Sequence, residues 1–198
     1  MQSSPPIASR SGYLSEPEAK ALLAAFGLRV TRERRVRSAA AAGDAADAIG
    51  YPVVLKGVSD KVVHKSDAGL VRLGLAERAS VEAAFNDVSK KLRALDPAAE
   101  ECVVAEMVSG GLELILGAKR DLQFGPVVLV GAGGVLVELM RAIEVALAPI
   151  SRQTAEAMLK RLRIWPLLQG FRNQSRRDVA AVVDALVKVG VLAAALGD

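Results

Sequence analysis

The sequence predicts an α+β protein, because helix and strand segments alternate in its first half and a run of strands then leads into helices. The helix segments repeat apolar residues at helical spacing behind capping residues. The strand segments are short apolar runs between glycine, proline and polar residues. With 198 residues the chain can bury a sizeable core, as one domain or as two small lobes.

Residues 1–11 are polar and rich in proline and serine, which predicts a disordered tail. A helix is expected over residues 16–26, because Ser15 and Glu18 have the capping-box spacing and Gly27 supplies a stop. A strand, a helix, two strands and a helix are then expected, over residues 28–37, 38–50, 51–57, 69–76 and 80–95.

Ser80 is expected to cap the last of these helices, and Asp96 with Pro97 to end it. Four adjacent strands should follow, over residues 102–108, 112–119, 126–131 and 134–139. Two helices, over residues 151–163 behind Ser151 and over residues 176–196, complete the prediction.

The stretch "FGPVVLVGAGGVLVELM", residues 124–140, places an apolar run directly before three glycines. It does not fit the dinucleotide-binding pattern, because Leu136 stands at the third glycine position. The acidic residue expected further on to hold ribose is also replaced, by Ser151. The better interpretation is a strand, a glycine turn and a second strand that carries Glu138. Such an arrangement is either a plain hairpin or a loop that binds a ligand.

Composition excludes several classes of protein. Although 52% of the residues are apolar, the longest charge-free stretches contain Gly, Gln and Pro and are too short for a membrane span. The first residues lack the apolar region of a signal peptide. Cys102 is the only cysteine, so no disulfide framework is possible and a reducing cytoplasm is expected.

The net charge of +4 arises partly from the basic runs at residues 29–37 and 161–177. Nucleic acid is disfavoured as a partner, because aromatic residues make up only 4% of the chain and do not interleave with the basic ones. The charge suits an anionic ligand or an acidic partner subunit, with a solvated basic face as the alternative.

Two basic side chains are candidates for phosphate chemistry. Lys56 ends a buried strand, where its stem can pack while its ammonium meets an oxyanion. His64, the only histidine, lies in a loop with Lys65 and Asp67 beside it. A lone loop histidine is either a solvated side chain or a nucleophile able to carry a phosphoryl group near neutral pH.

Two carboxylates, Glu113 and Glu138, stand on predicted strands among apolar neighbours. Charges in such places need partners, and Mg²⁺ or ribose hydroxyls are natural ones in a nucleotide site. The alternative is that both carboxylates face solvent from their strands.

Several motifs occur together and in one order: "YPVVLK", "HKSDAGLV", "EMVSGGLELILGAKRDLQFGPVVLVGAGGVLVEL", "LAPI" and "LLQGFR". In this order they resemble the ATP-grasp domain of NDP-forming acyl-CoA synthetases, the family that contains ADP-forming acetyl-CoA synthetase. The resemblance implies an ATP-grasp fold over residues 12–198, with a nucleotide cleft between two α/β lobes. These would be a small lobe, residues 12–105, and a large lobe, residues 106–198.

The resemblance also implies roles for individual residues. Lys56 would contact the phosphates of ATP or ADP, the backbone at Glu106, Met107 and Val108 the adenine, and Glu113 the ribose. The phosphate-side turn would consist of Gly131, Gly133 and Gly134, and Glu138 would bind Mg²⁺. His64 would carry phosphoryl, in a supporting loop made of Lys65, Ser66, Asp67 and Gly69.

By the same resemblance, the reaction is acyl-CoA + ADP + phosphate giving acid + CoA + ATP, reversibly, with Mg²⁺ and ATP/ADP bound. The partner would be a CoA-binding subunit or domain of the same synthetase, in a hetero-oligomer. The isolated chain is therefore expected to be inactive.

Four departures from the family pattern bear on activity. Leu70 replaces the second glycine of the HKSD-x-GGV motif, and Ala142 and Ala146 stand where an Asp and an Arg are usual. The family's final acidic D-I-N-P strand is expected to be missing after residue 198. The alternative function is therefore a non-catalytic ATP-grasp-like module for regulation or interaction, as in synthetase–acetyltransferase fusions.

Overall fold

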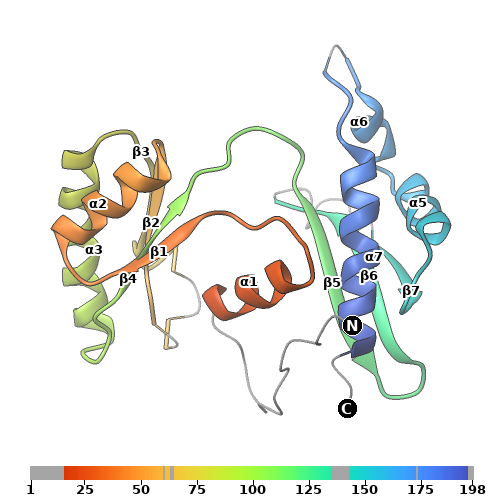
Figure 1. The fold of residues 1–198 in the computed structure, drawn as a ribbon, viewed down its shortest axis with the longest axis horizontal. Helices are drawn as coiled ribbons and strands as arrows, with labels where there is room; N and C mark the ends of the chain where they lie inside the picture. Colours follow the sequence, from red (N-terminus) through yellow and green to blue (C-terminus); the bar gives the residue numbers. More distant parts are fainter. Residues whose placement is uncertain (1–15, 60, 63–64, 135–142, 173, 196–198) are drawn as a thin grey trace. The chain divides into compact units, whose positions relative to one another are not determined.

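A computed structural model of the chain describes residues 16–59, 61–62, 65–134, 143–172 and 174–195 (Figure 1). The chain divides into two compact units. The central unit contains residues 30–109, and the terminal unit contains the described residues of 1–29 and of 110–198. No helix among the described residues is long and apolar enough to cross a membrane.

The central unit is a four-stranded sheet with two helices. Its strands lie in the order β1 (Glu33–Val36), β4 (Cys102–Glu106), β2 (Val53–Gly57) and β3 (Val71–Leu75). All three neighbouring pairs are antiparallel. The helices are α2 (Ala39–Ile49) and α3 (Arg78–Leu95), and Figure 1 shows both beside the sheet.

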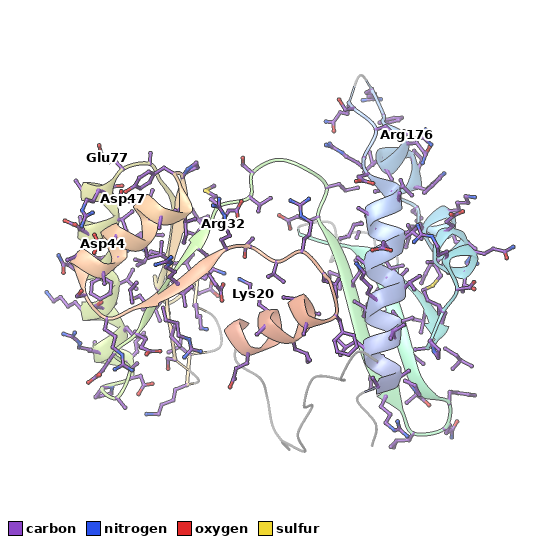
Figure 2. All side chains as sticks on the ribbon, in the orientation of Figure 1. Lys20, Arg32, Asp44, Asp47, Glu77 and Arg176 are labelled. Carbon is purple, nitrogen blue, oxygen red and sulfur yellow. The ribbon has the colours of Figure 1, made fainter. Side chains whose placement is uncertain are left out.

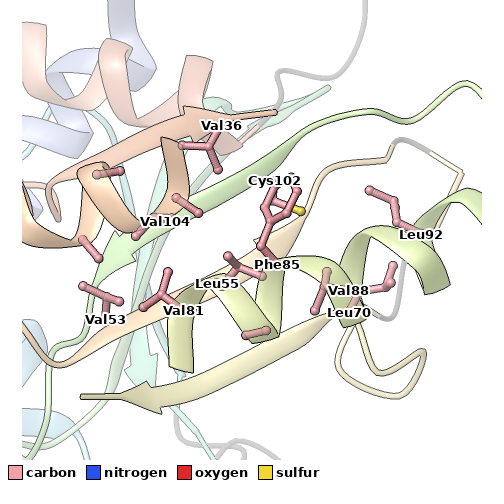
Figure 3. Packing of buried hydrophobic residues seen from close by; sticks show 14 of the residues in the cluster. Val36, Val53, Leu55, Leu70, Val81, Phe85, Val88, Leu92, Cys102 and Val104 are labelled. Atoms are coloured by element: carbon pink, nitrogen blue, oxygen red, sulfur yellow. The ribbon is translucent and has the colours of Figure 1, made fainter. Parts of the chain in front are cut away.

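One face of this sheet packs against both helices (Figure 3). Val53, Leu55 and Val104 are fully buried there, in one cluster with Phe85 and Val88 of α3. Because side chains alternate along a strand, Val54 and Lys56 lie on the opposite face. The strand register places Lys56 beside Val71 and Val103 on that face.

The helix boundaries follow from capping. The α2 helix, predicted over residues 38–50, spans Ala39–Ile49: Ser38 is its N-cap, whose Oγ accepts a hydrogen bond from the Ala41 N–H at 3.2 Å, and the helix ends at Gly50 with φ of 93°. The α3 helix begins earlier than predicted, because Glu77 and not Ser80 is its N-cap. The Ser80 hydroxyl lies inside the first turn and donates to the Glu77 carbonyl at 2.6 Å.

An ionic cluster joins the start of α3 to the second half of α2. Arg78 of α3 donates to Asp44 at 2.7 Å and to Asp47 at 2.6 Å, both on α2 (Figure 2). It also donates to Glu82, one turn further along α3, at 2.8 Å. These side chains are largely exposed, so each pair contributes little stability and the cluster mainly fixes how α2 lies against α3.

The terminal unit is a three-stranded antiparallel sheet, β5 (Leu114–Asp121), β6 (Gly125–Ala132) and β7 (Ile143–Leu147), in that order. Its helices are α1 (Glu16–Ala25), α5 (Arg152–Arg161), α6 (Trp165–Gln169) and α7 (Val179–Ala195). Val128 and Val130 of β6 pack with Met158, Leu159 and Leu186 in its core. The side of the sheet that carries these valines therefore faces the helices.

Two elements of the terminal unit were not expected from the sequence, β7 and α6. The β7 strand has the alternating exposure of a half-buried strand. The prediction missed it because it assigned the last strand to the preceding residues, 134–139. The α6 helix is only five residues long and has proline in its first turn, so it offers no periodicity to detect. Residues 135–139 of the predicted strand 134–139 lie outside the described residues.

The first helix, α1, belongs to the terminal unit. The family resemblance had implied that it lies in the small lobe, residues 12–105. Leu28, just after α1, packs against the core of the terminal unit. The Lys188 ammonium of α7 donates to the Gly27 carbonyl at 2.6 Å. These contacts join the start of the chain to its last helix, which no local sequence pattern reports.

Candidate functional site

The sequence-predicted site residues fall on both units, and the central unit carries Lys56 and the segment after β4. Lys56 is partly exposed on β2, on the face of the sheet opposite the helices. Val103, which pairs with it, is 6% exposed. The lysine stem therefore has an apolar neighbour, which suits a side chain that presents only its ammonium to a ligand.

Glu106 at the end of β4 is held by Arg32, which is labelled in Figure 2. Its Oε2 accepts hydrogen bonds from both the backbone N–H and the Nε of Arg32, each at 3.2 Å. The Glu106 N–H donates to the Arg32 carbonyl at 2.8 Å. Arg32 was not among the predicted site residues, because its partner is 74 positions away in the sequence.

The backbone beyond β4 becomes available to a ligand at Val108. The Met107 N–H donates to the Pro52 carbonyl at 3.3 Å, and the Met107 sulfur accepts from the Gly74 N–H at 3.2 Å. Within the described part of the chain, nothing accepts a hydrogen bond from the Val108 N–H. The Val108 side chain is 71% exposed.

The loop residues after His64 form a tight turn, while His64 itself lies outside the described residues. The Gly69 N–H donates to the Ser66 carbonyl at 3.0 Å, and the Leu70 N–H donates to the Lys65 carbonyl at 2.9 Å. Gly69 has φ of 65°, which favours glycine. Ser66 and Asp67 are exposed, and Lys65 is partly exposed.

Leu70, which replaces a glycine of the family motif, lies in the core. It is fully buried in the cluster between the sheet and the helices, and its carbonyl accepts from the Gly57 N–H at 2.9 Å. Among the described residues other than glycine, only Arg172 has a positive φ, so Leu70 needs no left-handed backbone. Leu70 therefore fits this loop with an ordinary backbone conformation.

The terminal unit brings Glu113 and the glycine turn together. The Gly133 N–H donates to the Glu113 carbonyl at 2.8 Å, just beyond the ladder that pairs Leu114 with Ala132. A Cβ atom at Gly133 would lie 2.8 Å from the Glu113 carbonyl carbon. At Gly134, with φ of 57°, it would lie 2.5 Å from Glu113 Oε2. Only glycine lets this carboxylate approach the turn so closely.

This arrangement offers two kinds of ligand contact in one place. Backbone amides at a glycine turn can bind phosphate or other anionic oxygens, and a carboxylate beside them can accept from hydroxyl groups. Gly131 pairs with Ile115 one step earlier in the ladder and so belongs to the strand that positions the turn. Glu138 and Ala142 lie outside the described residues.

Ala146 of β7 packs against the core of the terminal unit. It shares the helix-facing side of the sheet with Glu144, whose carboxylate accepts from the Nε of Arg161 on α5 at 2.6 Å. This pair was not predicted, because β7 itself was not. The alternation of exposed and partly buried residues along β7 is the signal that would have identified Glu144.

Cys102 does not take part in such a site. It is fully buried in the core of the central unit, 3.8 Å from the Ser89 hydroxyl. Burial raises the pKa of the Cys102 thiol, so the side chain stays protonated at neutral pH and is a poor nucleophile. The described residues also contain no group of three or more His, Cys, Asp or Glu side chains able to hold a metal ion.

Substitution of Gly133 tests whether the stability of the turn depends on the close approach of Gly133 to Glu113. Gly133→Ala is expected to lower the free energy of unfolding by about 1–3 kcal/mol, because the new Cβ meets backbone that cannot move aside. Gly117→Ala in β5 is the matched control, since its Cβ would meet only the Leu129 side chain, at 3.3 Å. Urea titrations of the terminal unit, followed by the fluorescence of its single tryptophan, Trp165, compare the two variants. Equal effects of both variants would contradict the close approach of Gly133 to Glu113.

Known proteins resemble this chain over most of its length. A sequence profile of the ATP-grasp domain matches residues 7–198. The ADP-forming acetate–CoA ligase I of Archaeoglobus fulgidus is 40% identical over 183 residues, which are 91% of this chain and 27% of the ligase. The subunit beta of the ADP-forming acetate–CoA ligase I of Pyrococcus furiosus is 36% identical over 182 residues, which are 91% of this chain and 78% of the subunit.

Solved structures agree with these relatives. The dinucleotide forming acetyl-coenzyme A synthetase 1 of Ca. Korarchaeum cryptofilum, with coenzyme A and Ca-AMPCP, matches with a TM-score of 0.85 and 40% identity, covering 90% of this chain and 79% of that chain. Its complex with coenzyme A and Mg-AMPPCP has the phosphohistidine segment pointing towards the nucleotide binding site (TM-score 0.81, 39% identity, 91% and 78% covered). Another complex has a phosphorylated segment in site I orientation (TM-score 0.80, 38% identity, 90% and 79% covered).

The central and terminal units are thus the two α+β parts of a fold shared with these synthetases. The chain spans 27% of the length of the Archaeoglobus ligase and 78% of the Pyrococcus subunit. Its relatives include both single-chain ligases and separate beta subunits of such ligases. With the family profile covering residues 7–198, this chain belongs to the ATP-grasp domain family.

Proposed function

We propose that this chain is the nucleotide-binding ATP-grasp part of an ADP-forming acyl-CoA synthetase. The observation that carries the proposal is the contact between Glu113 and the turn at Gly133 and Gly134, in a chain of this family. It joins a carboxylate and a glycine turn that the family resemblance assigns to one nucleotide.

The family resemblance assigns nucleotide contacts to residues of each unit. The turn at Gly131, Gly133 and Gly134 and the Lys56 ammonium lie against phosphate oxygens, and Glu113 accepts from ribose hydroxyls. The Val108 N–H, which donates to nothing in the described part of the chain, contacts the adenine. This assignment needs no rearrangement of the hydrogen bonds around Glu106 and Met107.

Mg²⁺ is the implied metal, and Glu138 is its protein ligand. The described residues alone offer no cluster of three metal-binding side chains. Mg²⁺ usually takes one or two carboxylates together with phosphate oxygens and water, so a single protein carboxylate is chemically sufficient for this role. When bound, the metal neutralises charge on the phosphates, a task that Lys56 shares.

His64 carries the phosphoryl group between a partner subunit or domain and the nucleotide. The partner forms acyl phosphate from acyl-CoA and phosphate, releasing CoA. An imidazole nitrogen of His64 then attacks phosphorus, the bond from phosphorus to the acyl oxygen breaks, and the acid leaves as carboxylate. A β-phosphate oxygen of ADP takes the phosphoryl group from His64, which gives ATP and frees the imidazole.

The partner is a CoA-binding subunit or domain of the same synthetase. The support is that relatives occur both as longer ligases and as separate beta subunits. The alternative, a non-catalytic ATP-grasp-like module, is not favoured by relatives that are named as ligases. A cytoplasmic setting, expected from the single cysteine, stays a prediction.

Nucleotide binding is the direct test of the proposed function. Mg-ADP at about 100 times its Kd should stabilise the chain by about 2.7 kcal/mol, measured as a rise in melting temperature. Glu113→Gln should weaken binding by about tenfold or more, because a hydrogen bond to a charged group contributes about 1.5–3 kcal/mol. Glu100→Gln, at an exposed carboxylate of the central unit, is the control and should bind like the original chain.

Isothermal titration calorimetry supplies the affinities. No heat with Mg-ADP or Mg-ATP, together with an unchanged melting temperature, would overturn the proposed function. Equal affinities of Glu113→Gln and Glu100→Gln would leave binding in place but reject the role of Glu113.

A further inference from the structure

Asp96, directly after α3, holds two side chains of the segment that leads from β2 toward His64. Its Oδ2 accepts from the Ser59 hydroxyl and its Oδ1 from the Lys61 ammonium, each at 2.8 Å. The Ser59 hydroxyl oxygen also accepts from the Lys61 N–H, at 3.1 Å. Asp96 and Ser59 are only 6% and 8% exposed, so one buried carboxylate fixes the backbone turn at Lys61.

Asp96 is itself held rigidly. Its N–H donates to the Leu92 carbonyl in the last turn of α3, at 2.8 Å, and its carbonyl accepts from the Ala99 N–H at 2.9 Å. The hydrogen bond from Lys61, and then that from Ser59, lowers the pKa of the Asp96 carboxyl. The side chain is therefore ionised at neutral pH, and a nearly buried carboxylate is tolerated because both of its oxygens are paired.

The other end of the same loop is also fastened to α3. The Arg72 guanidinium donates to the Gly69 carbonyl at 3.0 Å, and it forms an ion pair with Asp87 of α3. Asp87 accepts from the Lys91 ammonium as well, at 3.0 Å. Leu70, next to Gly69, is buried in the core. Ser59 and Lys61 on one side of His64 and Gly69 on the other are thus held through residues of α3 or directly after it.

His64 follows Lys61 by three residues in the sequence and precedes Gly69 by five. In the Korarchaeum synthetase, the phosphohistidine segment occurs pointing towards the nucleotide binding site in one structure and in site I orientation in another. A segment that must present one imidazole at two places gains accuracy from fixed ends, because phosphoryl transfer depends on alignment of the reacting atoms.

We propose that Asp96 is a positioning residue for phosphoryl transfer at His64: by holding Ser59 and Lys61, it fixes the point from which the His64 segment starts. This proposal rests on the proposed function. Asp96 is nearly buried and both of its carboxylate oxygens are paired within the chain, so we expect it to affect the rate at which His64 is phosphorylated and not the affinity for nucleotide.

The test compares Asp96→Asn with the original chain in two measurements. Asparagine keeps the size of the side chain but loses the charge that pairs with Lys61. We expect amide hydrogen exchange at Lys61, followed by NMR, to become about tenfold faster as the local structure opens. With the CoA-binding partner, acyl-CoA and labelled phosphate, phosphorylation of His64 should become about tenfold slower, while the Kd for Mg-ADP stays within about twofold.

Three further variants serve as controls. Asp184→Asn removes an aspartate of α7 that is likewise paired with two basic side chains, Arg152 and Lys188, and it should change neither measurement. Lys61→Met should reproduce the effect of Asp96→Asn, whereas Lys61→Arg should retain phosphorylation close to the original rate. If Asp96→Asn fails to fold, the comparison of Lys61→Met with Lys61→Arg tests the proposal in its place.

The outcomes separate this proposal from the proposed function. If the original chain binds Mg-ADP and takes label, but Asp96→Asn and Lys61→Met are labelled at the original rate, the positioning role of Asp96 is overturned and the proposed function stands. Unchanged exchange at Lys61 in both variants overturns it too. An original chain that takes no label overturns the phosphoryl relay, and the positioning role falls with it.

Discussion

Replacing His64 with alanine is expected to abolish all phosphoryl labelling of this chain. Under the proposed relay the label enters only as a bond between phosphorus and an imidazole nitrogen, and the chain has a single histidine. The one cysteine is no substitute for His64, because it is buried and kept protonated. The loss should be complete, in contrast to the partial effect of a binding residue.

The experiment mixes the chain with a CoA-binding partner, acyl-CoA and labelled phosphate, and quantifies acid-labile, base-stable label on the chain. His64→Ala must still bind Mg-ADP with the original affinity, which shows that the fold is intact. Label that remains on the variant at the original level would rule out the relay. Omitting the partner should also remove the label, because the chain alone is not expected to form acyl phosphate.

The α+β class and most elements could be predicted from local patterns. The α2 helix lies within the expected range 38–50 and ends at Gly50 as expected, since helix ends depend on a few adjacent residues. The same logic misplaced the start of α3, because Ser80 has the residue type of a cap but lies in the first turn behind Glu77. Local patterns do not distinguish these two positions.

The candidate site was predictable only in part. The family motifs named Glu113 and the glycines separately, and the structure brings them into contact across the β5–β6 ladder. The hydrogen bonds from Arg32 to Glu106 and from Ser59 to Asp96 could not be predicted, because they join residues 74 and 37 positions apart. Such contacts depend on how strands and helices pack, which the sequence pattern of neither partner encodes.

Leu70 shows how a departure from a motif can be misread. By sequence it removes a glycine from a loop, which suggests a loss of backbone freedom and of activity. In the structure its side chain is fully buried together with Val88 and Leu92 of α3 (Figure 3). The departure therefore adds apolar burial to the central unit, at the point where the His64 loop rejoins the sheet.

Leu70→Ala is accordingly expected to destabilise the central unit by about 2–5 kcal/mol, the usual cost of removing a buried leucine side chain and leaving a cavity. Leu73→Ala is the matched control: Leu73 lies three residues further along, in β3, but is 66% exposed, so its effect should stay within about 0.5 kcal/mol. Native-state hydrogen exchange of core amides such as that of Val104 measures both, since the only tryptophan, Trp165, reports on the terminal unit. A domain of this kind is typically stable by only about 5–15 kcal/mol. The Leu70→Ala variant should therefore lose a large fraction of its free energy of unfolding. Similar losses for Leu70→Ala and Leu73→Ala would contradict the burial of Leu70 and restore the interpretation of this position as part of a flexible loop.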